Sequence, residues 1–127
     1  MKKSYTDLEQ SKKLAEILPL DSADMSYTLD FDSVKYEIST TSYKSWVVPK
    51  YAESYKGFNQ ILPCWSLAAL LDVLKDDIKI EKTLFDQSDM FTYSILGDAY
   101  EYRTYEHENL IDACVEMIIK LKELNIL

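Results

Sequence analysis

Residues 61–74 read ILPCWSLAALLDVL, and this stretch decides how the chain is expected to fold. Placed on a helix at about 100° per residue, its apolar side chains point in nearly every direction, and only Ser66 and Asp72 interrupt them. A helix that is apolar on all sides is buried, either in a protein core or in a membrane. This stretch is too short to cross a bilayer, which takes about 20 residues. The sequence therefore predicts a buried central helix over residues 61–74.

The composition indicates one globular domain over residues 1–127. The chain is 47% hydrophobic and 28% charged, and its two glycines and three prolines leave little room for flexible linkers. A basic start with no apolar segment behind it predicts no signal peptide, and no apolar run is long enough for a membrane span. We therefore expect a cytoplasmic protein with no membrane partner. Cys64 and Cys114 lie in apolar patterns and are expected to pack as small hydrophobic residues rather than to form a disulfide.

The net charge of −8 is not spread evenly along the chain. Most of the acidic excess lies between Asp72 and Glu108. Because phosphates repel an acidic surface, nucleic acid is not an expected partner. The same charge leaves open an acidic mimic of DNA, which would need the carboxylates to line one continuous face.

Two amphipathic helices are predicted outside the central one. Thr6 and Glu9 fit a capping box, and a helix of about three turns follows them. Residues 109–124 form the C-terminal helix, with apolar side chains over an arc of about 220°. Glu116 and Lys120 are spaced for an ion pair on its narrow polar stripe. The wide apolar arc implies contacts on more than one side, either within the domain or with a second copy in a homodimer.

Between the helices, apolar and polar residues alternate, which predicts half-buried strands. The predicted strands are residues 25–31, 34–38, 43–48, 78–81, 90–96 and 99–105. The first two form a hairpin, and the last two flank Gly97-Asp98, a pair that favours a two-residue turn. The predicted order is α-β-β-β-α-β-β-β-α. Strands joined by tight turns make antiparallel sheets, so the expected fold class is α+β, with the sheets packed on the buried central helix and the C-terminal helix.

Little in the sequence indicates catalysis. His107 is the only histidine, and without a second histidine or a nearby cysteine a metal site has little support. Cys64 follows Pro63 at the expected start of the central helix, where a thiol can become nucleophilic. A cysteine-dependent enzyme would use His107 as its base, whereas the alternative is a buried packing cysteine. No phosphate-binding loop, dinucleotide fingerprint or nucleophile elbow is present, so no cofactor, catalytic residue or metal ligand is predicted.

Tyrosine is the most distinctive residue of the predicted strands. Seven of the ten tyrosines fall in these regions: Tyr27, Tyr36, Tyr43, Tyr93, Tyr100, Tyr102 and Tyr105. Such side chains either pack under helices or form an exposed aromatic face for a partner. In the last strand, Tyr100 and Tyr102 share one face, while Tyr105 points the other way. The residues predicted to contact a partner protein are Trp46, Tyr93, Tyr100, Tyr102, Asp76, Asp77, Asp86 and Asp89.

Three segments carry a resemblance to a known family: residues 63–71 (PCWSLAALL), residues 110–121 (LIDACVEMIIKL) and residues 14–20 (LAEILPL), the last followed by Ala23-Asp24-Met25. They resemble an uncharacterised family of small acidic proteins encoded in gut bacteria and their prophages or other mobile elements. The resemblance spans most of the chain and implies a mobile-element context. Its motifs are helix-core segments, and the family has no assigned catalytic residue, so the resemblance implies no role for any residue.

The sequence therefore favours a non-enzymatic accessory factor that binds another protein, through its tyrosine-bearing sheet or its acidic region. A module that binds a small molecule or nucleotide, or an enzyme that uses Cys64 and His107, is the first alternative. The acidic DNA mimic is the second. The accessibility of the Cys64 thiol in the native protein separates the enzyme from the binding factor, because only a reactive thiol could serve catalysis.

Overall fold

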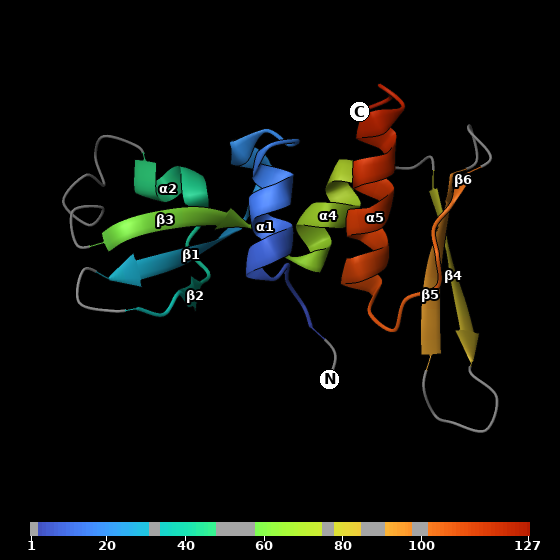
Figure 1. Cartoon of the computed structure of the whole chain (residues 1–127), viewed down its shortest axis with the longest axis horizontal. Helices are drawn as coiled ribbons and strands as arrows, with labels where there is room; N and C mark the ends of the chain where they lie inside the picture. The colour runs from blue at the N-terminus through green and yellow to red at the C-terminus, as the bar shows by residue number, and fades with distance from the viewer. Residues whose placement is uncertain (1–2, 31–33, 48–57, 75–77, 85–90, 98–101) are drawn as a thin grey trace. The chain divides into compact units, whose positions relative to one another are not determined.

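The computed structural model describes residues 3–30, 34–47, 58–74, 78–84, 91–97 and 102–127. These residues form two compact units. We call Tyr5–Ala69 the N-terminal unit, and Leu70–Leu127 together with Met1–Ser4 the C-terminal unit. Each contains a three-stranded antiparallel sheet with helices, so the fold class is α+β, as the sequence predicts (Figure 1). Within the described residues, no helix is both long enough and apolar enough to span a membrane.

The N-terminal unit is built around a sheet in the order β2-β1-β3. Its elements are α1 (Leu8–Ala15), the short 3-10 helix η1 (Leu20–Ser22), β1 (Met25–Asp30), β2 (Glu37–Ser39), α2 (Tyr43–Val47), β3 (Phe58–Cys64) and the start of α4 (Leu67–Leu74). Tyr27 in the central strand lies opposite Ile38 on one side and Leu62 on the other. The predicted hairpin of the first two strands is therefore confirmed. Leu14 and Trp65 are fully buried in this unit.

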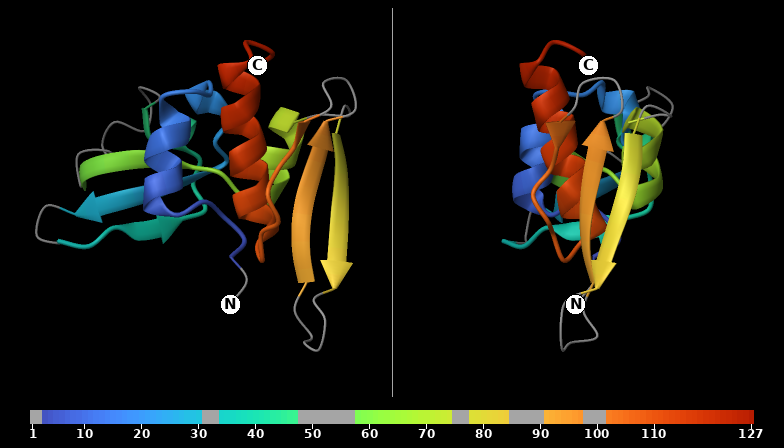
Figure 2. Two further views of the ribbon diagram at one scale, coloured as in Figure 1. Left: turned by 45° about the vertical axis from the view of Figure 1, so that its right-hand side comes forward. Right: turned by 90° about the vertical axis from the view of Figure 1, so that its right-hand side faces the viewer.

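The C-terminal unit is built around a second sheet in the order β4-β5-β6. Its elements are the remainder of α4, β4 (Ile78–Leu84), β5 (Phe91–Gly97), β6 (Tyr102–Arg103) and α5 (Leu110–Glu123). The helix α5 packs along β5, on one face of the sheet (Figure 2). Its apolar residues Ile111, Cys114, Met117 and Ile118 are buried, so the wide apolar arc of this helix is used within the chain.

The apolar run at residues 61–74 is not one helix, and this corrects the prediction. Residues as far as Cys64 belong to β3, and α4 begins only at Leu67. A short apolar run has the same appearance in a buried strand and in a buried helix. Pro63, which lacks an N–H group, is accommodated in the strand because β3 is at an edge of its sheet. The shorter helix α4 still buries Leu70 and Leu74.

The third strand predicted for the first sheet, over residues 43–48, is instead the helix α2. The third strand of this sheet is β3. A local cap explains the difference: the Ser42 hydroxyl oxygen accepts a hydrogen bond from the backbone N–H of Ser45 at 3.3 Å. Ser at the start of a helix supplies an acceptor for an otherwise unpaired N–H group. This contact outweighs the strand preference of the aromatic and β-branched residues that follow.

The cap of α1 lies one residue later than predicted. Asp7 and Gln10 form the capping box, in place of Thr6 and Glu9. Thr6 is fully buried, and its hydroxyl oxygen accepts a hydrogen bond from the backbone N–H of Trp65 at 3.2 Å. Its hydroxyl also lies 2.8 Å from that of Ser11. Thr6 is therefore used for tertiary contacts, and the exposed Asp7 takes the capping position.

The two-residue turn predicted at Gly97-Asp98 is wrong at Gly97, which belongs to β5 and lies opposite Tyr102. Asp98 lies outside the described residues. The antiparallel pairing of the two strands is nevertheless confirmed. The C-terminal helix is also confirmed, since α5 is flanked by Asn109 and Leu124 as its cap residues.

Candidate functional site

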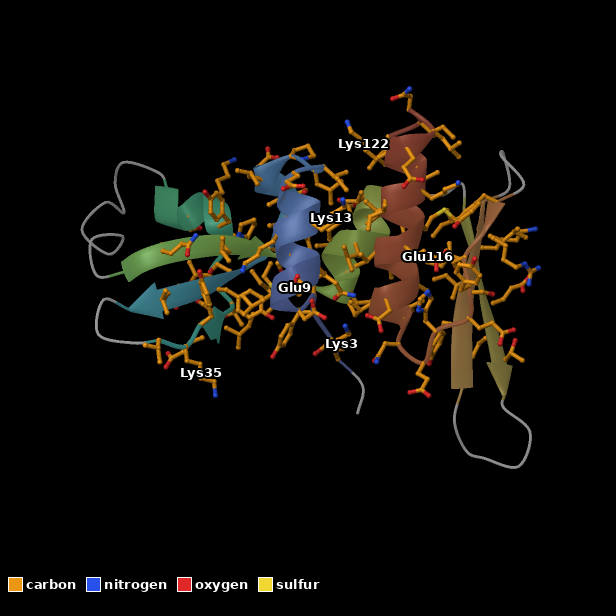
Figure 3. All side chains as sticks on the ribbon, viewed as in Figure 1. Lys3, Glu9, Lys13, Lys35, Glu116 and Lys122 are labelled. Atoms are coloured by element: carbon orange, nitrogen blue, oxygen red, sulfur yellow. The ribbon has the colours of Figure 1, made fainter. Side chains whose placement is uncertain are left out.

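The carboxylate of Glu116, in the middle of α5, binds three residues of the segment that runs beside β5. The Tyr102 hydroxyl donates a hydrogen bond to its Oε2 at 2.9 Å, and Nε2 of His107 lies 2.7 Å from its Oε1. The backbone N–H of Tyr105 donates to Oε1 at 3.2 Å and to Oε2 at 3.1 Å. Figure 3 labels Glu116 on the side of α5 nearest these strands. We call these four residues the Glu116 cluster.

The segment beyond β6 stays beside β5 but contains one extra residue. The backbone N–H of Thr104 donates to the carbonyl oxygen of Ile95 at 3.0 Å, and His107 exchanges two backbone hydrogen bonds with Tyr93. Between these contacts, Ser94 alone lies opposite both Tyr105 and Glu106, which is the pattern of a β-bulge. A bulge changes the direction in which side chains and N–H groups point. Here it accompanies an N–H group of Tyr105 that binds Glu116.

At the start of the bulge, a buried side chain is followed by an exposed one. Thr104 is buried, and its hydroxyl oxygen accepts a hydrogen bond from the backbone N–H of Ile95 at 2.8 Å. Tyr105, the next residue, is 82% exposed. The sequence-based expectation that Tyr105 points away from Tyr102 and Thr104 agrees with this arrangement.

The electrostatics of the Glu116 cluster keep its tyrosine protonated. Burial, together with the neighbouring Glu116 carboxylate, raises the pKa of Tyr102 to about 12, because a phenolate would be poorly solvated and repelled there. The Nζ atom of Lys120 lies 5.1 Å from the centre of the Tyr102 ring. Tyr102 therefore acts as a hydrogen-bond donor to Glu116 at neutral pH, which suits a structural clamp more than a nucleophile.

Metal binding has no geometric support in the described part of the chain. No group of three histidine, cysteine, aspartate or glutamate side chains gathers there closely enough to hold an ion. His107 contributes its ring nitrogen to Glu116, which is a pair rather than a coordination set.

Cys64 is not at a helix N-terminus as predicted. It is the last residue of β3, it is fully buried, and its thiol donates to the carbonyl oxygen of Thr6 at 3.5 Å. Burial raises the pKa of the Cys64 thiol, which keeps it in the protonated form. A protonated and buried thiol is a poor nucleophile. The cysteine-dependent enzyme considered for this chain therefore loses its support.

This environment predicts that neither cysteine reacts in the folded protein. Burial also raises the pKa of Cys114 to about 12. We expect labelling by a thiol-specific disulfide reagent at pH 8 to be at least about 100-fold slower in the native protein than in denaturant, because the reagent needs an opening of the structure. A Cys114→Ser variant assigns the remaining signal to Cys64. Rapid labelling of that variant without denaturant would restore the case for a reactive cysteine.

The structure separates the residues predicted to contact a partner into three groups. Tyr93 and Tyr102 are half-buried and lie on the face of the sheet that α5 covers, so they are not the exposed aromatic face that was predicted. Trp46 is part of the helix α2, not of a strand. The remaining predicted residues lie outside the described part of the chain: Tyr100, Asp76, Asp77, Asp86 and Asp89. Tyr105, which is not among the residues predicted to contact a partner, is exposed.

Comparisons with protein-family models, with curated proteins and with solved structures find no match for this chain. Its function is therefore inferred from its own residues.

Proposed function

We propose that this protein is a non-enzymatic accessory factor that binds another protein through Tyr105. The observation that carries this proposal is the 82% exposure of Tyr105 on a backbone position that the Glu116 carboxylate holds. A tyrosine side chain offers a large apolar ring with a polar end and loses little conformational freedom when it binds. Tyrosine is also one of the residues that contribute most to binding at protein interfaces.

The charges beside Tyr105 indicate the chemistry of the partner. Glu106 and Glu108 are exposed, whereas the nearby Arg103 forms a double hydrogen bond with Glu81 at 2.7 and 3.1 Å. The carboxylates of Glu106 and Glu108 give negative charge to the segment that carries Tyr105. Charge complementarity across an interface speeds association and selects partners. A partner with a pocket for an aromatic ring and a basic rim therefore fits this surface best.

The resemblance to small acidic proteins of prophages and other mobile elements supports one further part of the proposal. It favours an activity in the cytoplasm of a bacterium that carries such an element. A protein partner that interacts with phage or mobile-element functions is consistent with this context. The acidic composition, with a net charge of −8, favours a protein over nucleic acid as that partner.

The experiment that tests this function is a comparison of two tagged proteins expressed in the native host. We expect a stoichiometric partner to be recovered with the wild type, and its affinity to fall at least about 30-fold with Tyr105→Ala, as for a central interface residue. Mass spectrometry identifies the partner, and binding of the purified components gives the affinity. High salt should weaken the wild-type complex, because Glu106 and Glu108 are exposed.

Val34→Ala is the matched control, since Val34 is a fully exposed apolar residue of the N-terminal unit. It should leave binding of the partner unchanged. Circular dichroism should show that both variants keep the wild-type fold, because neither change removes a buried group. Equal recovery of the partner with Tyr105→Ala and with the wild type would contradict the assignment of Tyr105, and recovery of no partner would contradict a binding function under those growth conditions.

A further inference from the structure

The strand β4 forms one edge of the sheet in the C-terminal unit. In the order β4-β5-β6 it pairs with β5 on one side, and among the described residues no strand pairs with its other side. Figure 2, in its right-hand view, shows β4 in yellow at the margin of the sheet. It is seven residues long and regular, with each residue from Ile78 to Leu84 opposite one residue of β5. A long, regular edge strand can accept another strand through its backbone groups.

An apolar side chain lies exposed at this edge. Ile80 is 42% exposed, although its neighbour across the strand pair, Ile95, is fully buried. Ile80 therefore extends the buried face of the sheet to its margin. A second strand that brought an apolar residue next to Ile80 would continue the core of the sheet beyond β4.

The sequence of β4 allows one favourable register with a copy of itself. Successive residues of a strand direct their backbone groups to alternate sides, so in an antiparallel pair of identical strands the two opposed residues have both even or both odd numbers. The registers that overlap over most of β4 are centred on Ile80, Glu81 or Lys82. The register centred on Glu81 places Glu81 opposite Glu81, and the register centred on Lys82 places Lys82 opposite Lys82. Like charges directly opposite each other are destabilising.

The register centred on Ile80 has the opposite property. It places Ile80 opposite Ile80, and it places Lys79 of each strand opposite Glu81 of the other. Opposite charges in such positions stabilise a strand pair by about 0.2–1 kcal/mol. The charged residues of β4 therefore favour this register and disfavour the others.

We propose that two copies of this protein associate through β4 as an antiparallel pair with Ile80 at the two-fold axis. The pairing joins the β4-β5-β6 sheet of one copy to the same sheet of the other copy, which gives one continuous sheet. It is closed, because both copies use the same β4 edge in a two-fold pair, which leaves no second β4 edge for a third copy. This inference does not depend on the proposed role of Tyr105, which lies beyond β6 rather than on β4.

Charge exchange between two variants tests this register directly. Lys79→Glu places the new glutamate opposite Glu81 in a self-pair, and Glu81→Lys places the new lysine opposite Lys79, so each variant alone should be a monomer. Mixed together, the two variants place opposite charges at both positions and should form a heterodimer. Sedimentation velocity from about 1 µM to about 1 mM, a range that covers weak interfaces, measures each state. The wild type should change from monomer to dimer within this range, and Ile80→Lys should abolish the dimer.

Thr83→Glu is the matched control on the same strand. In the register centred on Ile80, Thr83 lies outside the paired residues, so this variant should dimerise like the wild type. In the register centred on Glu81, Thr83 would lie opposite Lys79, and the substitution would change the dimer. Glu81→Lys also removes the exposed contact with Arg103, a contact of this kind being worth about 0–1 kcal/mol, so the variant should remain folded. A wild type that stays monomeric up to the highest concentration would overturn the proposal. A dimer that persists in Ile80→Lys, or a mixture that fails to associate although both variants are folded, would do the same.

Discussion

Replacing Trp65 with alanine is expected to lower the free energy of unfolding by about 3–5 kcal/mol, the cost typical of removing a large aromatic side chain from a core. Trp65 is fully buried, and no side chain that the structure describes in that state is larger. Its indole N–H donates to the hydroxyl oxygen of Ser22 at 3.0 Å, and its backbone carbonyl oxygen accepts from the N–H of Thr6 at 2.9 Å. Since proteins are stable by only about 5–15 kcal/mol, this variant should be close to unfolding at 37 °C.

Urea denaturation followed by circular dichroism measures this effect, because tryptophan fluorescence changes with the substitution itself. Ser22→Ala separates the two contributions of the side chain. It removes the hydrogen-bond acceptor but leaves the indole ring in place, so it should cost only about 1 kcal/mol. If Trp65→Ala cost no more than Ser22→Ala, the ring would not have the packing role that its burial indicates.

The fold could be predicted from the sequence where the pattern is long and local. The structure confirms the helix over residues 109–124 and the strands that begin at Met25 and Ile78. These elements could be predicted because their apolar residues recur with a regular spacing along the whole element. The helix predicted at residues 61–64 is wrong, because an apolar run contains no such period. What decides that segment is tertiary, because residues 61–64 pair with β1, where Cys64 lies opposite Met25 and Ile61 lies opposite Thr28. The helix α4 begins only after Ser66, whose backbone N–H and hydroxyl donate hydrogen bonds to the carboxylate of Asp24.

The candidate site was harder to predict than the fold. The sequence predicts Glu116 on the polar stripe of its helix as an ion-pair partner of Lys120, which is a local relation. In the structure the Glu116 carboxylate binds the segment beside β5, and Lys120 lies 3.8 Å from Glu123. Spacing within one helix does not reveal what faces the helix from another element. Alternation along the strand predicts that Tyr105 and Tyr102 point to different faces, but it does not show which of the two faces is exposed.

Replacing Glu116 with alanine is expected to lower the free energy of unfolding by about 2–3 kcal/mol. One carboxylate serves the hydroxyl of Tyr102, the backbone N–H of Tyr105 and the imidazole of His107. A hydrogen bond to a charged group contributes about 1.5–3 kcal/mol. The expected loss is smaller than the sum of the three hydrogen bonds. The side chains of His107 and Glu116 remain 27% and 22% exposed, so water can form part of the hydrogen bonds that the substitution removes. Urea denaturation gives the value.

Glu123→Ala is the control on the same helix. The Glu123 side chain is 63% exposed and lies near Lys120, so its removal should change stability by no more than about 0.5 kcal/mol. Hydrogen exchange gives a second measurement, because the Tyr105 amide should exchange faster in Glu116→Ala than in Glu123→Ala. Glu116→Ala should also bind the partner less tightly, although Tyr105 itself is unchanged. Without Glu116 the backbone of Tyr105 is not held in place beforehand, so binding has to order it at a cost in free energy. Equal stability and equal Tyr105 exchange in the two variants would show that Glu116 does not hold this segment, and Tyr105 would then be exposed without being positioned.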